Sequence, residues 1–422
     1  MPKKYIFYLL LPLLISIFGC SKKTPSEIDV IQQLELQTPN GGEIISIGSQ
    51  CTITWATQNI DKVKIEYSVI AGIWVLIDTV NAETASYQWA VPVLPSSGCR
   101  IRVSDKSDGL PADSSDQSFS INGQWMDLSG DGYWAPRMEQ AAIVFDNKMW
   151  VMGGNQTNYI SGPAYNDVWY SSNGNDWTQA SSNAQWAPRF GHSVATFNGK
   201  LWLLGGNVYS RDTNDIWSST DGITWQLVTS AAQWSGRSNF AALSFDGKLW
   251  VLGGRQLPST VYNDVWYSSD GVLWQKVPDA IPWAARCYHS TVVYDNKMWI
   301  MGGGANSKAT SILNDVWYSS DGVNWQQPVE HAAWDARWGH KAVMYDNKMW
   351  LVGGDDSTHY GLDSTTRKND MWYSTDGIDW DQACATSPWA GRWGHSVAVL
   401  GQKIYVMGGF TGMVNKEVWC WP

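Results

Sequence analysis

Hydrophobic and polar residues alternate in short runs along this chain, and from Trp125 onwards the runs recur with a period near fifty residues. Each repeat holds four runs, which in the first copy are residues 141–145, 149–152, 167–170 and a run that begins at Trp177. Pairs such as Asp146-Asn147 and Asn173-Gly174 separate neighbouring runs, and these residue types tolerate the positive φ of a two-residue hairpin turn. The pattern therefore predicts four antiparallel strands in every repeat.

A fixed frame of aromatic, arginine and glycine residues runs through all six repeats. A Trp lies nine residues before the Trp of each Trp-x-x-Arg step, and thirteen residues after the Arg an aromatic residue comes shortly before a Gly-Gly pair. The six arginines are Arg137, Arg189, Arg237, Arg286, Arg337 and Arg392. Because such units cannot bury their faces alone, they stack on one another. Six four-stranded units predict an all-β fold, a six-bladed β-propeller over residues 122–422.

The two ends of the repeat region indicate how the ring closes. The last repeat stops at Pro422, after its third strand, whereas Trp125 stands nine residues before Trp134 with no earlier strands of a repeat ahead of it. We therefore expect the N-terminal strand to supply the fourth strand of the last blade. Closure of this kind removes exposed sheet edges, which otherwise favour aggregation.

The repeats resemble the Kelch family of propellers. The resemblance rests on the Arg-x-Gly-His step, as in Arg189-Phe190-Gly191-His192, on the Leu-Trp-x-Leu-Gly-Gly strand, and on a later aromatic–Trp pair. It covers about 300 residues and all six repeats. A Trp stands in the third strand where Kelch sequences usually have Tyr.

The N-terminus carries a leader. Lys3 and Lys4 precede an apolar run over residues 5–18 that ends in Gly19-Cys20, and the run is short for a membrane-spanning helix. It resembles the signal peptide of bacterial lipoproteins, residues 1–20, with Cys20 as the lipidated residue. Residues 21–34 read as a flexible tether. The resemblance implies a membrane partner through the lipid anchor and a place in the cell envelope, at the outer membrane.

Residues 35–121 predict a small β-sandwich, because apolar positions alternate in its runs. Segments such as 38–43 and 87–92 resemble the Ig-like or fibronectin-like N-terminal domain of yeast cell-wall synthesis proteins and of Ser/Thr-rich GPI-anchored proteins, which implies a spacer or adhesion module. Cys51 and Cys99 both fall on inward-facing positions, and the expected compartment is oxidising, so we expect a disulfide between them. Two buried thiols are the alternative.

One connection of the repeat varies in length, and this connection indicates the candidate binding face. The segment between the Gly-Gly pair and the third strand runs 11, 7, 8, 10, 14 and 6 residues in the six repeats, while the other joints are constant. A scaffold that varies one loop places function there. Strand direction puts these loops on the same face as the six arginines. The arginines are candidates for an anion- or peptide-binding ring, or for ion pairs with the acid that opens each third strand.

The residue after each Arg also varies. Phe190, Trp338 and Trp393, with the nearby Tyr288, are candidates for ligand stacking at the channel mouth, or for core packing. Four repeats place a His three residues after the Arg, one per blade, which does not make a metal site. We predict no metal and no cofactor. The net charge of −10 excludes a nucleic-acid partner of the usual basic kind.

The Kelch resemblance implies two enzyme alternatives. N-acetylneuraminate epimerases, which are sugar mutarotases, use channel-facing Glu and Arg, for which Glu139 is the candidate here. Galactose oxidase-like copper enzymes use Tyr, His and a Cys–Tyr crosslink, but the adjacent Cys287, Tyr288 and His289 cannot converge from one strand. We therefore predict a monomeric, non-catalytic, lipid-anchored envelope protein whose loop face engages a carbohydrate or protein ligand.

Overall fold

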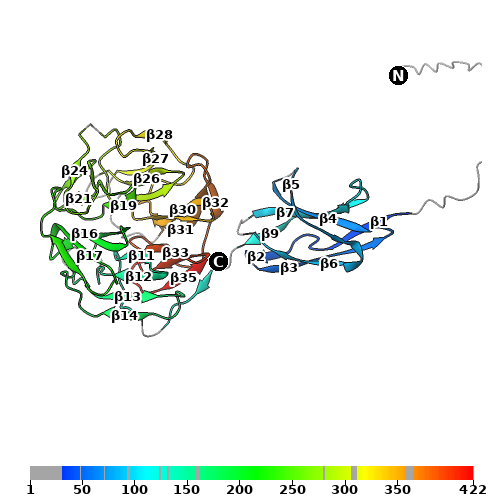
Figure 1. The fold of residues 1–422 in the computed structure, drawn as a ribbon, viewed down its shortest axis with the longest axis horizontal. Coiled ribbons are helices and arrows are strands. Elements are labelled where there is room, and N and C mark those ends of the chain that lie inside the picture. The colour runs from blue at the N-terminus through cyan, green and yellow to red at the C-terminus, as the bar shows by residue number, and fades with distance from the viewer. Residues whose placement is uncertain are drawn as a thin grey trace, which may run out of the picture. The chain divides into compact units, whose positions relative to one another are not determined.

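The computed structural model describes residues 31–47, 49–70, 72–92, 96–122, 125–130, 133–157, 162–278, 281–305, 311–357 and 365–421 (Figure 1). The predicted signal peptide, including Cys20, and most of the tether lie outside the described residues. The chain separates into two compact units. Within the described ranges, the structure contains no helix of the length and apolarity needed to cross a membrane.

The N-terminal part consists of small sheets. One has the order β1 (Gln33–Thr38), β3 (Gln50–Gln58), β6 (Ser86–Ala90). The other has the order β2 (Ile44–Ser46), β9 (Phe119–Asn122), β7 (Ser96–Asp105), β4 (Lys62–Ile70), β5 (Ile73–Asn81), with β8 (Ala112–Ser114) paired to β7 and a 3-10 helix over Ala82–Thr84. Ile53 and Trp55 alternate with more exposed neighbours along β3, as the sequence predicts. The Trp55 indole donates to the Ala82 carbonyl at 3.0 Å, which satisfies its buried N–H.

The expected disulfide between Cys51 and Cys99 is not formed in the structure. Cys99 is fully buried in β7 and its Sγ lies 3.9 Å from the Ser96 carbonyl oxygen. Cys51 lies near the start of β3 and is only partly buried. Burial raises the pKa of both thiols, which keeps them protonated and unreactive.

The remaining strands form six four-stranded antiparallel sheets, as the repeats predict. Blades 1 to 3 are β11 (Ala141–Phe145), β12 (Lys148–Met152), β13 (Val168–Ser171), β14 (Thr178–Ser181); β15 (Ser193–Phe197), β16 (Lys200–Val208), β17 (Arg211–Ser219), β18 (Gln226–Thr229); and β19 (Ala241–Phe245), β20 (Lys248–Leu252), β23 (Val265–Ser268), β24 (Gln275–Lys276). Blades 4 to 6 are β25 (Ser290–Tyr294), β26 (Lys297–Gly304), β27 (Ile312–Ser319), β28 (Gln326–Val329); β29 (Lys341–Tyr345), β30 (Lys348–Asp355), β31 (Arg367–Ser374), β32 (Asp381–Cys384); and β33 (Ser396–Leu400), β34 (Lys403–Met407), β35 (Val418–Trp421), β10 (Met126–Asp127). A two-stranded hairpin, β21 (Arg255–Gln256) with β22 (Thr260–Val261), extends blade 3.

The hairpin turns follow from the residues that the sequence places there. Asp146 and Asn147, between β11 and β12, adopt φ of 49° and 54°, the left-handed region that these residue types tolerate. Gly222, in the turn between β17 and β18, has φ of 74°, and a Cβ there would meet the Trp150 ring of blade 1 at 2.5 Å. Glycine at this position therefore allows both the turn and the close contact between blades.

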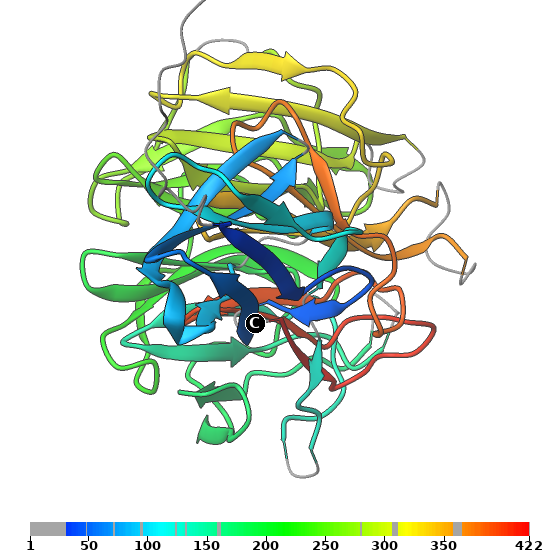
Figure 2. The ribbon, with the colours of Figure 1, turned by 90° about the vertical axis from the view of Figure 1, so that its right-hand side faces the viewer.

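Tryptophan pairs join each blade to the next. The first Trp of each pair belongs to a Trp-x-x-Arg step, and the second stands just before the fourth strand that follows it in the chain. The two rings pack edge-on, as in Trp134 and Trp177, whose ring centroids lie 6.2 Å apart. The same contact closes the ring, because Trp389 packs against Trp125 at 5.7 Å. β10 pairs with β35 through Met126 and Cys420, so the N-terminal strand completes the last blade as predicted. Figure 2 shows the strands turned by 90°, coloured in chain order.

A circle of backbone hydrogen bonds also runs around the axis of the propeller. One residue of each blade, two positions after the arginine, donates its N–H to the carbonyl of its counterpart in the preceding blade, over 2.7 to 3.2 Å. We call these residues the closure ring; they are Glu139, Gly191, Asn239, Tyr288, Gly339 and Gly394. All six have φ between 53° and 67°. This conformation costs a residue with a side chain free energy, and most of all a bulky one such as Tyr288.

Candidate functional site

The six arginines of the repeat lie inside the walls of the blades. Arg137 places Nη1 2.6 Å from one oxygen of Asp167 and Nη2 2.7 Å from the other, and Nη1 also donates to the Gly153 carbonyl at 2.8 Å. The same two-oxygen pairing recurs in blades 2 to 5, whereas in blade 6 Arg392 pairs with its acid through Nη2 alone. The acids are, in chain order, Asp167, Asp215, Asp264, Asp315, Asp370 and Glu417. The arginine side chains are at most 1% exposed. The geometry therefore favours the ion-pair interpretation over an open anion-binding ring.

In two blades the ion pair also lowers the pKa of its acid. Burial alone would raise the pKa of Asp215, but the hydrogen bonds and charge of Arg189 outweigh it, and the net effect is a lowered pKa. The same balance lowers the pKa of Asp264 beside Arg237. A Trp two residues further along donates its indole N–H to each acid, as Trp217 does to Asp215 at 2.7 Å. The ion pair thus favours the charged form of Asp215 and that of Asp264.

The residues directly after the six arginines, one in each repeat, form a column of equivalent positions. Side chains of this column fill the channel on the loop side of the closure ring. Met138, Cys287, Tyr288, Trp338, Trp393 and Phe410 pack into one cluster, which we call the plug. Trp338 is fully buried and Trp393 is 2% exposed, with 4.5 Å between their ring centroids. Phe190, in the same column, is also buried. The stacking interpretation of these aromatic residues is therefore corrected: they fill core volume, because they meet across the axis where no ligand face stays open.

A polar network ties three members of the closure ring together. The Tyr288 hydroxyl donates to Glu139 Oε1 at 3.0 Å. The Asn239 amide, oriented to satisfy both of its atoms, donates to Glu139 Oε2 at 3.2 Å and accepts from Arg255 at 3.3 Å. Burial raises the pKa of Glu139, although the charge of Arg255 and the Tyr288 hydroxyl oppose this. Glu139 thus lies in the channel, as the mutarotase alternative requires, with both carboxylate oxygens engaged.

The four repeat histidines lie between blades rather than in a common site. Burial lowers the pKa of His192 and of His289 to about 3, and the charge of the neighbouring arginine adds to this. The pKa of His340 and that of His395 are held well below the usual value for the same reasons. Among the residues that the structure describes, no group of three His, Cys, Asp or Glu side chains gathers as a metal site would need. These imidazoles are neutral parts of the blade packing.

A groove opens on the loop face beside blade 2. The β16–β17 hairpin continues beyond its sheet, and it forms a groove of about 870 Å³ with β18 and with the Gln256–Leu257 segment of blade 3. Tyr209 lies at the tip of the hairpin, 81% exposed, and Leu227 of β18 is 49% exposed. Both apolar and charged groups line it. None of the residues that line the groove belongs to the plug.

Hydrogen bonds hold the walls of the groove in place. Asp212 accepts from the Asn207 amide at 2.9 Å and from the backbone N–H of Leu257 at 2.7 Å, which links blades 2 and 3. Gly236 lies directly under the hairpin, since a Cβ there would meet the Asp212 carbonyl oxygen at 2.3 Å. The groove is therefore preformed, as ligand sites usually are.

Sequence reasoning placed function on the variable loops but did not single out this one. The two longest of these loops, residues 155–165 and 355–368, lie partly outside the described residues. The signal that could have found the groove is Tyr209, a large aromatic residue in the middle of a seven-residue polar loop. The length of this loop does not mark it as a binding loop, because only one of the six loops is shorter.

Comparison with known proteins places the propeller in a family. The sequence profile of the KLHDC2/KLHL20/DRC7 Kelch-repeats domain matches residues 118–303 and 285–421, and the chain belongs to this family. It is similar to protein tag-53 of Caenorhabditis elegans, with 34% identity over 87 residues. It is also similar to the leucine-zipper-like transcriptional regulator 1 homolog of Drosophila melanogaster, with 32% identity over 79 residues. The matches cover 19% and 18% of this chain and only 6% and 8% of those proteins.

Proposed function

We propose that this protein is a non-catalytic binding protein of the cell envelope, whose propeller captures a ligand in the groove beside the β16–β17 hairpin. The observation that carries the proposal is Tyr209. This residue is 81% exposed and adopts φ of 48°, and Ser210 after it adopts φ of 66°. A two-residue turn of this kind favours Asn and Gly, so a tyrosine there costs stability. An exposed aromatic side chain kept at such a cost is typical of a binding residue.

The groove favours a segment of a protein as its ligand over a carbohydrate. Its volume of about 870 Å³ fits several residues of an extended chain. Leu227 and Tyr209 offer apolar contacts, while the exposed Arg211 offers a charged group at the rim. An apolar centre with a polar rim is typical of protein interfaces. Membership of the Kelch family, whose propellers typically bind proteins, supports the same choice.

The envelope part of the proposal rests on the sequence of the leader. Gly19-Cys20 after an apolar run, with Lys3 and Lys4 before it, matches the pattern of a lipoprotein signal. Several acyl chains on Cys20 would hold the protein at the membrane, whereas a single chain binds only marginally. A tethered monomer would then present its groove to ligands in the same compartment.

The test uses the full-length protein in detergent on a random-peptide display library and on a glycan array. We expect Tyr209→Asn to leave the melting temperature equal or higher, because Asn suits the left-handed turn, and to weaken peptide binding at least tenfold. Leu227→Ala should weaken it similarly. The matched control is Leu273→Ala, since Leu273 is 65% exposed outside the groove. Binding unchanged in both groove variants would refute the proposal, and selective binding to glycans alone would refute the ligand class.

A further inference from the structure

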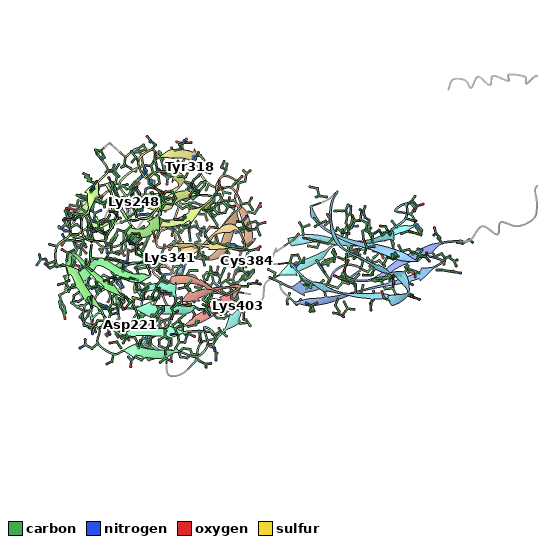
Figure 3. All side chains as sticks on the ribbon, viewed as in Figure 1. Asp221, Lys248, Tyr318, Lys341, Cys384 and Lys403 are labelled. Atoms are coloured by element: carbon green, nitrogen blue, oxygen red, sulfur yellow. The ribbon has the colours of Figure 1, made fainter. Side chains whose placement is uncertain are left out.

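The channel has a second region, on the other side of the closure ring from the plug. The first residue of each innermost strand, four positions after the arginine, faces it. In chain order these residues are Ala141, Ser193, Ala241, Ser290, Lys341 and Ser396. Five small side chains leave a cavity of about 200 Å³, which we call the well. Lys341 is the one large residue in this column, and Figure 3 places it near the centre of the six sheets.

The charge of Lys341 lies close to the axis. It lowers the pKa of His192 in blade 2, of His289 in blade 4 and of His395 in blade 6. Lys341 also lines the well together with residues of all six blades. The ammonium group therefore projects into the well rather than back along its own blade.

Among the described residues, the charge of Lys341 is compensated only in part. Its ammonium makes neither an ion pair nor a hydrogen bond there, and the one acid that acts on it does so through its charge alone. The nearest acid that acts on it is Glu139, whose carboxylate oxygens are already engaged by Tyr288 and Asn239. The hydroxyls of Ser290 and Ser396 donate to backbone carbonyls of His340 and Gln140 instead. A half-buried ammonium whose one acidic neighbour is already engaged by other groups is costly.

We propose that the well is a binding site for a small oxyanion, a phosphate or a short carboxylate, which Lys341 holds as its counter-charge. The volume of about 200 Å³ admits such an anion with some water but no polymer. The plug and the closure ring close the loop side, so the anion enters from the face that bears the turns between first and second strands. Burial lowers the pKa of Lys341, and a bound anion would raise it again. This ligand is independent of the one proposed for the groove.

The test compares thermal unfolding in inorganic phosphate and in acetate for the wild type and for two variants. Lys341→Met removes the charge and keeps the length of the side chain. Lys403→Met is the control, because Lys403 is exposed on β34 and forms no ion pair among the described residues. We expect phosphate or acetate to raise the wild-type melting temperature by several degrees more than that of Lys341→Met. Lys341→Met should also melt higher than wild type without added anion. Lys403→Met should behave as wild type.

Equal anion responses in wild type and Lys341→Met would overturn the proposal, because only general salt effects would remain. A response lost in Lys403→Met as well would overturn it too. If Lys341→Met does not fold, crystals of the wild type soaked in selenate decide: anomalous density within hydrogen-bond distance of the Lys341 Nζ supports the site, and its absence there contradicts it. Tyr209→Asn should keep the anion response, so failure in the groove and failure in the well are separable.

Discussion

The two sides of the closure ring are built from the same joint of the repeat but have opposite character. One position after the arginine, Trp338 and Trp393 of blades 5 and 6 pack against each other in the plug. Four positions after the arginine, five blades have a small side chain and leave the well, and Lys341 of blade 5 is the large residue at this position. The backbone is equivalent on both sides. Side-chain volume in two columns therefore decides which part of the channel is core and which part can receive a ligand.

The largest expected effect is on the plug side. Trp338→Ala removes a fully buried ring whose indole donates to the Ser357 carbonyl at 3.1 Å. We expect a loss of about 3–5 kcal/mol in the free energy of unfolding, measured by urea denaturation. Trp338→Phe, which keeps an aromatic ring, should lose clearly less. If Trp338→Ala lost under about 1 kcal/mol, the plug would not be packed core.

His340, which follows the closure-ring residue Gly339, gives a smaller, pH-dependent effect on stability. Burial holds the pKa of His340 well below that of an unfolded histidine, which is about 6.5. The unfolded chain therefore binds more protons between these values, and stability falls as the pH drops below about 6.5. Blade 1 has Gln140 at this position, which donates to the Met407 carbonyl at 2.8 Å. His340→Gln should reduce the acid-dependent loss by about 1.4 kcal/mol per pH unit.

Urea denaturation at pH 6.0, 5.5 and 5.0 measures this slope. His331→Gln is the control, because His331 is exposed and does not belong to the four repeat histidines. A slope in His340→Gln that equals the wild-type slope would mean that His340 takes up a proton in the folded state. The folded protein would then contain a charged His340 imidazole rather than a neutral one.

Most of the fold could be predicted from the sequence, because its determinants are local and repeated six times. The turn residues Asp146 and Asn147 indicate their hairpin directly, and the spacing of Trp125 to Trp134 predicts the closing strand. The ion pairs were one of two interpretations, since sequence shows six acids and six arginines but not their distances. The pairing lies within a blade, as between Arg337 and Asp370.

The candidate sites were harder to predict, because they depend on which way a column faces. Trp338 and Trp393 break the repeat pattern, which is equally typical of a binding surface and of core packing, and only the packing across the axis decides between them. The sequence does not indicate a site at Lys341, because a single lysine usually lies in solvent. Tyr209 required knowledge of its exposure and backbone conformation. Each depends on contacts or conformations that a repeat pattern does not encode.

Hydrogen–deuterium exchange at the six amides of the closure ring tests the central claim most directly, since the ring is what separates the plug from the well. Each of these N–H groups is bonded to the neighbouring blade over 2.7 to 3.2 Å. We predict that they exchange only through openings that cost nearly the full free energy of unfolding. Exchange as fast as that of the exposed hairpin tip at Tyr209 would contradict the claim, because the channel would then be open from one face to the other.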